Sequence, residues 1–319
     1  MQHSTATGPH QDTPPAAAAP LVTIVALCYN HAPFLAEALN SILAQTYPNI
    51  EVILVDDAST DGSRTMLAQY AAAHPTWQTI FLDDNIGNCR AFNQAFRQGR
   101  GEFFIDFATD DVLLPARVAR QVACFQQLAP NYGVVYSDAE LIDEASQLVR
   151  RHYRRDAQGQ LHPRPASGFV FADVLSRYFI STPTMMMRCS VLEQLQGYDE
   201  TLAYEDFDFW VRAARDFRFY FQDEVTTQKR LHPASMSRRG YQPNDPFLAS
   251  TIRVCRKALA LCRTPTERAA LAVRLRWELR QAVRWGNYRE AQDLYDLLRA
   301  TQAARPLDRA LALYARLRR

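Results

Sequence analysis

Two adjacent carboxylates at the end of an apolar segment are the residues best suited to chemistry in this chain. Residues 103–107 are mostly apolar and predict a buried strand, and Asp110 and Asp111 follow it closely. Ligands of open α/β sheets bind at the carboxyl ends of the strands. Neighbouring carboxylates repel one another unless a cation or donors compensate them, and hard divalent metals are often shared with substrate phosphates. The sequence therefore predicts a metal–diphosphate site at this edge.

Two further polar side chains follow other predicted strands. Asp57 comes after the apolar segment 51–55, where a carboxylate can accept hydrogen bonds from a nucleobase N–H group or a ribose hydroxyl. The alternative for Asp57 is a turn carboxylate that caps the helix expected near Gly62. Arg90 lies in residues 85–93, and its planar donor fork suits a base or a phosphate. The alternative for that segment is an ordinary loop and helix start.

Asp206 stands at the expected start of a helix over residues 207–215. The dipole of a helix favours a negative charge at its N-terminus, and a carboxylate beside a reacting sugar can act as general base. The alternative is a helix cap, with Asp208 and Arg212 paired at i, i+4.

The elements that must position these side chains alternate between strand and helix. Apolar runs predict the strands, and a stripe of helical spacing predicts a helix that carries Leu35, Ala38, Leu39 and Ile42. The predicted strands of this part are 21–28, 51–55, 79–82 and 103–107. This alternation of strands and helices predicts a doubly wound, mainly parallel sheet.

The second part of the chain gives a more mixed pattern. It predicts a short strand at 134–136, a flexible polar loop over 145–168, helices at 191–195 and 207–215, and a strand at 217–221. Met185, Met186 and Met187 are expected to pack in the core, because methionine commonly fills gaps between apolar groups.

The two ends of the chain differ in composition from its centre. Residues 1–20 are polar and rich in proline and alanine, which predicts a disordered tail. Residues 246–319 predict helices. Residues 250–319 hold 16 Lys and Arg against 6 Asp and Glu, a net charge of +10, whereas residues 1–249 come to −8. Basic amphipathic helices can lie on an anionic membrane surface, although solvated faces and helix packing are the commoner explanation.

Cysteine usage and motif content exclude several classes of protein. None of the six cysteines has CxxC spacing, which argues against a zinc ribbon. Several of them lie among apolar residues, where a free thiol behaves as a small hydrophobic group, and this indicates a reducing compartment. No segment approaches the about 18 apolar residues that a membrane span needs, and the N-terminus lacks the order of a signal peptide. We therefore expect a cytoplasmic protein, free or peripheral at the inner face of the membrane. No GxGxxG follows the first strand, which excludes a dehydrogenase, and no nucleic-acid-binding module is recognisable.

Taken together, these motifs resemble the inverting family 2 glycosyltransferases of the GT-A fold. The resemblance covers about residues 20–240 and rests on the order and spacing of several segments, which are 22–25, 29–30, 41–47, 55–63, 109–111 and 205–206. It implies an α/β fold with a Rossmann-like, doubly wound mixed sheet and a C-terminal all-helical extension. We expect a GT-A domain over 21–245, with a nucleotide-sugar-binding half at 21–112 and an acceptor and catalytic half at 113–245, and a basic helical region at 246–319.

The resemblance also implies roles for the candidate residues. Asp57 would bind the base, and Tyr29 would line the nucleotide pocket. Asp111 would hold Mg²⁺ or Mn²⁺ on the diphosphate, with Asp110 toward the ribose or the donor sugar. Asp206 would be the catalytic base.

Other residues receive less direct assignments. His232, in a segment similar to the family's basic stretch, would contact the metal or the diphosphate, or is a loop histidine on the surface. Arg90 joins the donor contacts, and Tyr136, Asp138 and Glu205 are candidates for the acceptor side.

The implied reaction is metal-dependent hexosyl transfer from a nucleoside-diphosphate sugar, expected to be UDP-linked, to a saccharide, lipid-linked or other acceptor hydroxyl. Bacterial surface polysaccharide or glycoconjugate assembly would be its setting. Polymerisation of the kind that processive members carry out is not expected, because no segment is long and apolar enough to span a membrane. Two alternatives stay open, which are a binding protein without transfer activity and a nucleotidyltransferase. A nucleotidyltransferase usually has a Gly-rich loop after its first strand, unlike residues 29–33 here.

Overall fold

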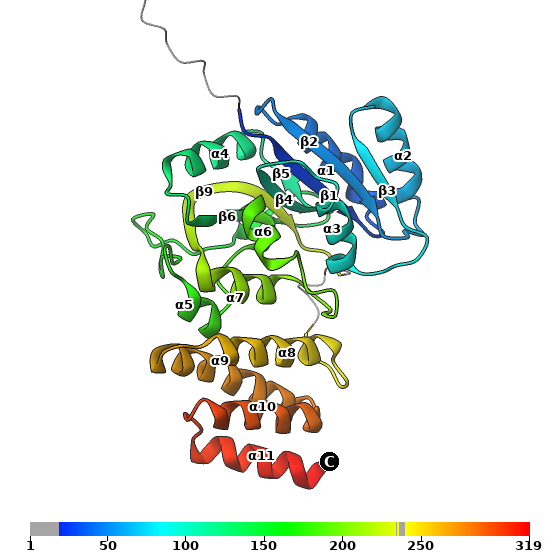
Figure 1. Cartoon of the computed structure of the whole chain (residues 1–319). Coiled ribbons are helices and arrows are strands. Elements are labelled where there is room, and N and C mark those ends of the chain that lie inside the picture. Colours follow the sequence, from blue (N-terminus) through cyan, green and yellow to red (C-terminus); the bar gives the residue numbers. More distant parts are fainter. Residues whose placement is uncertain (1–18, 234, 236–239) are drawn as a thin grey trace, which may run out of the picture.

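The structure, a computed structural model, describes residues 19–233, 235 and 240–319. The predicted tail at 1–20 lies almost entirely outside the described residues. Figure 1 shows a curled sheet with helices packed around it and, below it, a stack of helices at the C-terminal end.

The first half of the sheet is built from the predicted strand–helix units. Its apolar strands are buried and are joined by helices whose apolar stripes face them, as Leu35, Ala38, Leu39 and Ile42 do. The elements are β1 (Val22–Cys28), α1 (Ala32–Leu43), β2 (Ile50–Asp56), α2 (Ser63–Ala73), β3 (Gln78–Phe81), α3 (Asn88–Phe96) and β4 (Phe103–Ala108). All pairings among these strands are parallel.

The second half makes the sheet mixed. The strand order is β3-β2-β1-β4-β8-β6-β9-β5, and β8 pairs antiparallel with both β4 and β6. The elements are β5 (Val112–Leu113), α4 (Arg117–Gln127), β6 (Tyr132–Ile142), β7 (Leu148–Arg151), α5 (Phe171–Ser176), the 3₁₀ turn η1 (Thr182–Thr184), β8 (Met186–Arg188), α6 (Cys189–Leu195), α7 (Asp206–Asp216) and β9 (Arg218–Arg230). The predicted mixed α/β sheet is confirmed.

Several predicted elements of this half are wrong in extent. The loop expected at 145–168 contains β7, which pairs with the outer part of β6. All four residues of β7 are exposed, so the sequence has no alternation of apolar and polar residues that would predict this strand. The strands expected at 134–136 and 217–221 correspond only to the first parts of the longer strands β6 and β9, which pair with one another in parallel. Met185, Met186 and Met187 are buried, as expected.

Two apolar cores fill the two faces of the sheet. Successive side chains of a strand point to opposite faces, and on β1 they separate accordingly, with Ile24 in one core and Val25 in the other. The core that contains Val25 continues without a break into the C-terminal helices, where Leu271, Leu275 and Leu279 are fully buried.

The C-terminal region is therefore packed onto the sheet domain. Its helices are α8 (Pro246–Leu261), α9 (Pro265–Arg284), α10 (Tyr288–Ala300) and α11 (Pro306–Arg318). Thr264 and Glu267 form a capping box that starts α9. Ion pairs join this region to α7, since Lys257 contacts Asp208 at 2.6 Å and Arg215 contacts Glu267 at 2.7 Å. Throughout the described ranges, no helix is both long enough and apolar enough to cross a bilayer.

Candidate donor and catalytic site

Asp57 lies at the carboxyl end of β2 and holds the loop that follows β3. Its two carboxylate oxygens accept backbone N–H groups from Ile86 at 2.8 Å and Gly87 at 3.0 Å. Burial raises the pKa of Asp57 above its ordinary value, although these two hydrogen bonds oppose the shift. The start of α2 is served by Asp61, which accepts the N–H of Ser63. Asp57 therefore does not cap that helix.

Asp110 and His232 form a pair beside the end of β4. The Asp110 Oδ2 and His232 Nε2 atoms are 2.9 Å apart, and His31, whose Nδ1 lies 3.0 Å from Thr109 Oγ1, stands next to them. Burial alone would raise the pKa of Asp110, but the hydrogen bond with His232 and the charges of both histidines lower it below its ordinary value. Asp110 is therefore ionised.

Asp111 faces a different environment. It is 3% exposed, and its Oδ1 accepts the backbone N–H of Arg230 at 2.8 Å. Burial, reinforced by the charge of Asp110, raises the pKa of Asp111 well above its ordinary value. The Arg230 side chain closes the same corner, with Nε donating to the Asp110 carbonyl and Nη2 to Glu37. The pKa values of the two adjacent carboxylates are thus shifted in opposite directions, because burial dominates at Asp111 and the two histidines outweigh it at Asp110.

A third acidic group lies at the N-terminus of α7. Asp206 accepts hydrogen bonds from the Phe207 N–H at 2.6 Å and from Thr182 Oγ1 at 3.3 Å, and burial raises its pKa. Glu205 accepts from Asn88 Nδ2 at 2.7 Å. Burial, and then the charges of Asp206 and Asp106, raise the pKa of Glu205 to about 8. Glu205 therefore carries its proton at neutral pH, and Asp206 is the member of the pair better able to accept one.

Lys229 connects these two groups and was missed by the sequence analysis. It lies on β9, and its charge acts on both Asp111 and Asp206. Its ammonium group has no hydrogen-bond or ion-pair partner among the residues described. The basic segment was noted in the sequence only from Arg230 onward, one residue too late. The charge of Lys229 therefore reaches both Asp111 at the end of β4 and Asp206 at the start of α7.

Two predicted donor contacts occupy less defined positions. Tyr29 follows β1 and is 47% exposed. Arg90 is exposed in the first turn of α3, where its charge helps to lower the pKa of Glu200, although the hydrogen bonds from Asn93 and Arg97 contribute more. Both remain predictions.

Two predicted acceptor contacts are buried instead. Tyr136 is 0% exposed, and its hydroxyl donates to the Ala166 carbonyl at 2.6 Å. Asp138 is also 0% exposed and accepts the backbone N–H groups of Ala139 and Tyr153. Neither side chain lines a path that an acceptor could follow. This expectation is corrected, because both side chains are turned into the core of the β6–β9 part of the sheet.

The residues present fit a divalent cation that is shared with a substrate. Asp110 offers a carboxylate, the oxygen ligand that Mg²⁺ and Mn²⁺ favour, and His232 adds an imidazole nitrogen beside it. Within the described part of the chain, no three His, Cys, Asp or Glu side chains gather into a complete metal site. A cation bound by Asp110 and His232 would need further ligands, which the oxygens of a substrate phosphate can supply.

Comparison with known proteins agrees with this geometry. The glycosyl transferase family 2 model matches residues 23–196. The chain belongs to this family. It is 30% identical to an uncharacterized glycosyltransferase of Rickettsia typhi over 67% of this chain and 65% of that protein, so it spans just under two thirds of that relative's length. TuaG of Bacillus subtilis, provisionally assigned to teichuronic acid biosynthesis, is 31% identical over 39% of this chain and 52% of its own.

Solved structures show the fold. S. aureus TarS in complex with UDP-GlcNAc superposes with a TM-score of 0.67 at 18% identity, over 93% of this chain and 88% of that one. The mannosyltransferase PcManGT from Pyrobaculum calidifontis, in complex with GDP-Man and Mn²⁺, gives a TM-score of 0.55 at 20% identity, over 94% and 81%. The family 2 chain therefore has the GT-A fold, with α8–α11 as its helical extension.

The raised pKa of Glu205 predicts a pH dependence of stability. Between the ordinary value of 4.5 and about 8, the folded protein holds a proton that the unfolded chain has released, so the free energy of unfolding falls as the pH rises through this range. Glu205→Gln should flatten this fall between pH 5 and pH 8 by about 1 kcal/mol or more, measured by urea unfolding at several pH values. Glu144→Gln, at an exposed position, is the control. Parallel curves for wild type and Glu205→Gln would contradict the assignment.

Proposed function

We propose that this family 2 glycosyltransferase moves a hexosyl unit from a nucleoside-diphosphate sugar to an acceptor hydroxyl with inversion at the anomeric carbon. The observation that carries the proposal is the Asp110–His232 pair beside the end of β4, together with Asp206 at the start of α7. Such a transfer needs a group that holds the diphosphate and a general base, and these residues supply one of each.

The donor is assigned to the edge formed by β1, β2 and β4. Asp57 reads the base, since each of its oxygens keeps a free lone pair beside the backbone N–H group that it accepts. Tyr29 covers the base or ribose from its exposed position after β1. UDP is the expected nucleotide, supported by the complex of TarS with UDP-GlcNAc, although PcManGT binds GDP-Man.

Asp110 and His232 are the proposed ligands of Mg²⁺ or Mn²⁺. This exchanges the roles that the resemblance implies for the two aspartates, because Asp111 is buried and already accepts the Arg230 N–H. When bound there, the cation would offset the charge that grows on the departing diphosphate. Lys229 contributes a second positive charge to the same space.

Asp206 is the proposed general base. Its carboxylate is oriented by Thr182 and by the first turn of α7. Its pKa is raised by burial, which brings the carboxylate closer to the working pH and makes it a better proton acceptor. The acceptor hydroxyl gives its proton to Asp206 as its oxygen bonds to the anomeric carbon, and the bond between that carbon and the diphosphate oxygen breaks on the opposite side.

Asp206→Asn should separate catalysis from donor binding. We expect kcat to fall about 10²- to 10⁴-fold, because the amide accepts no proton, while the affinity for UDP in the presence of Mn²⁺ stays within about twofold. Release of UDP from a donor panel and calorimetry with UDP measure the two quantities. Asp216→Asn, at the other end of α7, is the matched control. Turnover of Asp206→Asn at the wild-type rate would remove this role and would leave donor binding without base catalysis as the better account.

Asp110→Asn should weaken the metal-dependent part of donor binding. We expect the affinity for UDP to fall at least about tenfold with Mn²⁺ present and to be unchanged after chelation, because the amide loses the charge that attracts the cation. Calorimetry on Asp110→Asn and Asp111→Asn in parallel provides the comparison. If only Asp111→Asn loses the effect of Mn²⁺, then the assignment first implied by the resemblance is the correct one.

We also propose a setting in surface polysaccharide or glycoconjugate assembly, supported by the likeness to TuaG.

In this setting, α11 is proposed to lie on an anionic membrane surface. The outward side of α11 carries an apolar stripe at helical spacing, and arginines flank it on both sides. The apolar residues, each at least 48% exposed, are Leu307, Leu313, Tyr314 and Leu317, and the flanking cations are Arg309, Arg316 and Arg318.

Vesicle flotation tests this contact. Wild type should float with vesicles that contain phosphatidylglycerol but not with pure phosphatidylcholine, because the arginines need anionic headgroups. Leu313→Glu combined with Leu317→Glu should abolish flotation, whereas Leu148→Glu on exposed β7 should not. Wild-type protein that stays in the bottom fraction with both vesicle types would contradict the proposal.

A further inference from the structure

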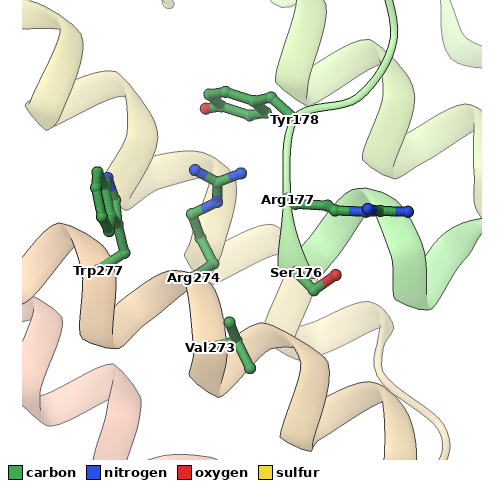
Figure 2. Close-up of a pocket in the computed structure, with 6 residues that line it drawn as sticks. All are labelled: Ser176, Arg177, Tyr178, Val273, Arg274 and Trp277. Carbon is green, nitrogen blue, oxygen red and sulfur yellow. The ribbon is translucent and has the colours of Figure 1, made fainter. Parts of the chain in front are cut away.

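A pocket lies where the helical region meets the catalytic domain, away from the donor edge. Its volume is about 360 Å³, within the range of small-molecule sites. It is lined by residues at the end of α5 and on one face of α9, which are Ser176, Arg177, Tyr178, Val273, Arg274 and Trp277. We call it the α5–α9 pocket. Figure 2 shows Trp277 and Tyr178 on either side of the Arg274 guanidinium.

Arg274 leaves hydrogen-bond donors without partners in this pocket. It is only 6% exposed, and its Nη1 contacts Glu278 at 3.3 Å. Its Nε and Nη2 atoms are buried and have no hydrogen-bond partner among the described residues. The guanidinium carbon lies 3.9 Å from the centre of the Tyr178 ring, a cation–π contact that gives the N–H groups no hydrogen-bond acceptor. Buried donors of this kind are costly, and their geometry suits the oxygens of a carboxylate or a phosphate.

The aromatic walls favour a sugar. Trp277 and Tyr178 are 53% and 48% exposed, so both rings are accessible to a ligand. Aromatic rings carry a negative face, on which the C–H groups of a sugar ring can pack. The Trp277 ring is held in place by a hydrogen bond from its Nε1 to the Tyr241 hydroxyl at 3.2 Å. Arg177 lies at the rim, and its guanidinium points away from Arg274 (Figure 2).

The pocket adjoins the proposed base. The Tyr178 ring packs edge-on against Phe207, with 5.2 Å between ring centres, and Phe207 is the residue that follows Asp206. The Arg274 guanidinium carbon lies 5.4 Å from the same Phe207 ring, and the charge of Arg274 acts on Asp206. The pocket is therefore joined to the N-terminal end of α7, where Asp206 lies, through the Phe207 ring.

We infer that the α5–α9 pocket is an acceptor subsite that binds a negatively charged sugar unit, with Trp277 and Tyr178 holding the ring and Arg274 pairing with its carboxylate or phosphate. This inference rests on the proposed transferase function, because it assigns the acceptor side of that reaction. It makes α9, which lies outside the matched family segment at 23–196, a part of substrate recognition.

The test uses full-length protein labelled with ¹⁵N at its tryptophan side chains. Glucose 1-phosphate, glucuronate, glucose and inorganic phosphate are titrated separately, and the indole N–H signal of Trp277 is identified by its loss in Trp277→Phe. We expect a saturable shift of this signal with glucose 1-phosphate or glucuronate, at least tenfold weaker binding of glucose, and no shift of the Trp285 signal. Which of the two charged sugars binds more tightly distinguishes phosphate from carboxylate.

A pair of variants at the pocket rim tests the charge. Val273 is 51% exposed, so a polar side chain there should not prevent folding. Val273→Glu should weaken binding of the charged sugar at least tenfold relative to Val273→Gln, since the added carboxylate repels the ligand from Arg274. Equal affinity for glucose, inorganic phosphate as strong as glucose 1-phosphate, or no Trp277 shift with any probe would each overturn the inference. Calorimetry of wild type with UDP and Mn²⁺ tests the donor site separately, so a failure of the proposed function is recognised independently.

Discussion

The site depends on two adjacent carboxylates whose pKa values are shifted in opposite directions. Asp110 and Asp111 are consecutive residues, and full ionisation of both would be opposed by their mutual repulsion. The structure resolves this conflict by giving each a different partner, a histidine pair for Asp110 and a buried backbone N–H group for Asp111. Arg230 connects the two, because its backbone serves Asp111 while its side chain binds the Asp110 carbonyl. The end of β9 therefore fixes the chemistry at the end of β4, although about 120 residues separate them in the chain.

The first half of the sheet could be predicted from the sequence, because its signals are local. The apolar runs of β1, β2 and β4 end in polar residues, and parallel strands bring those ends to one edge regardless of finer detail. The second half of the sheet could not be predicted as well. β7 is exposed on all its residues and has no apolar pattern, and the burial of Tyr136 and Asp138 follows from the pairing of β6 with β9. The roles proposed for Lys229 and Arg274 depend on neighbours that are far away in sequence. The spacing of residues along the chain does not reveal those neighbours.

The C-terminal helices pack against the sheet domain and form one unit with it, rather than a separate domain. They share one apolar core with α7 and with one face of the sheet, and the Lys257–Asp208 and Arg215–Glu267 pairs lock α7 against them. The excess of arginine in this region suggested that it forms a separate part of the protein from the sheet domain. Several of these arginines are in fact engaged in internal contacts, as Arg253 with the Thr201 carbonyl and Arg276 with Asp308 show.

The division of the sheet into two separate cores has a consequence for how such proteins diversify. The helices α1, α2 and α4 pack on one face, and α3, α7 and the C-terminal helices pack on the other. Substitutions on opposite faces share few neighbours, so their energetic effects are close to additive. Substitutions around α9 can therefore accumulate independently of substitutions in the layer that packs on the other face of β1 and β2. New sugar preferences can arise in this way on a nucleotide-handling framework that stays as it was.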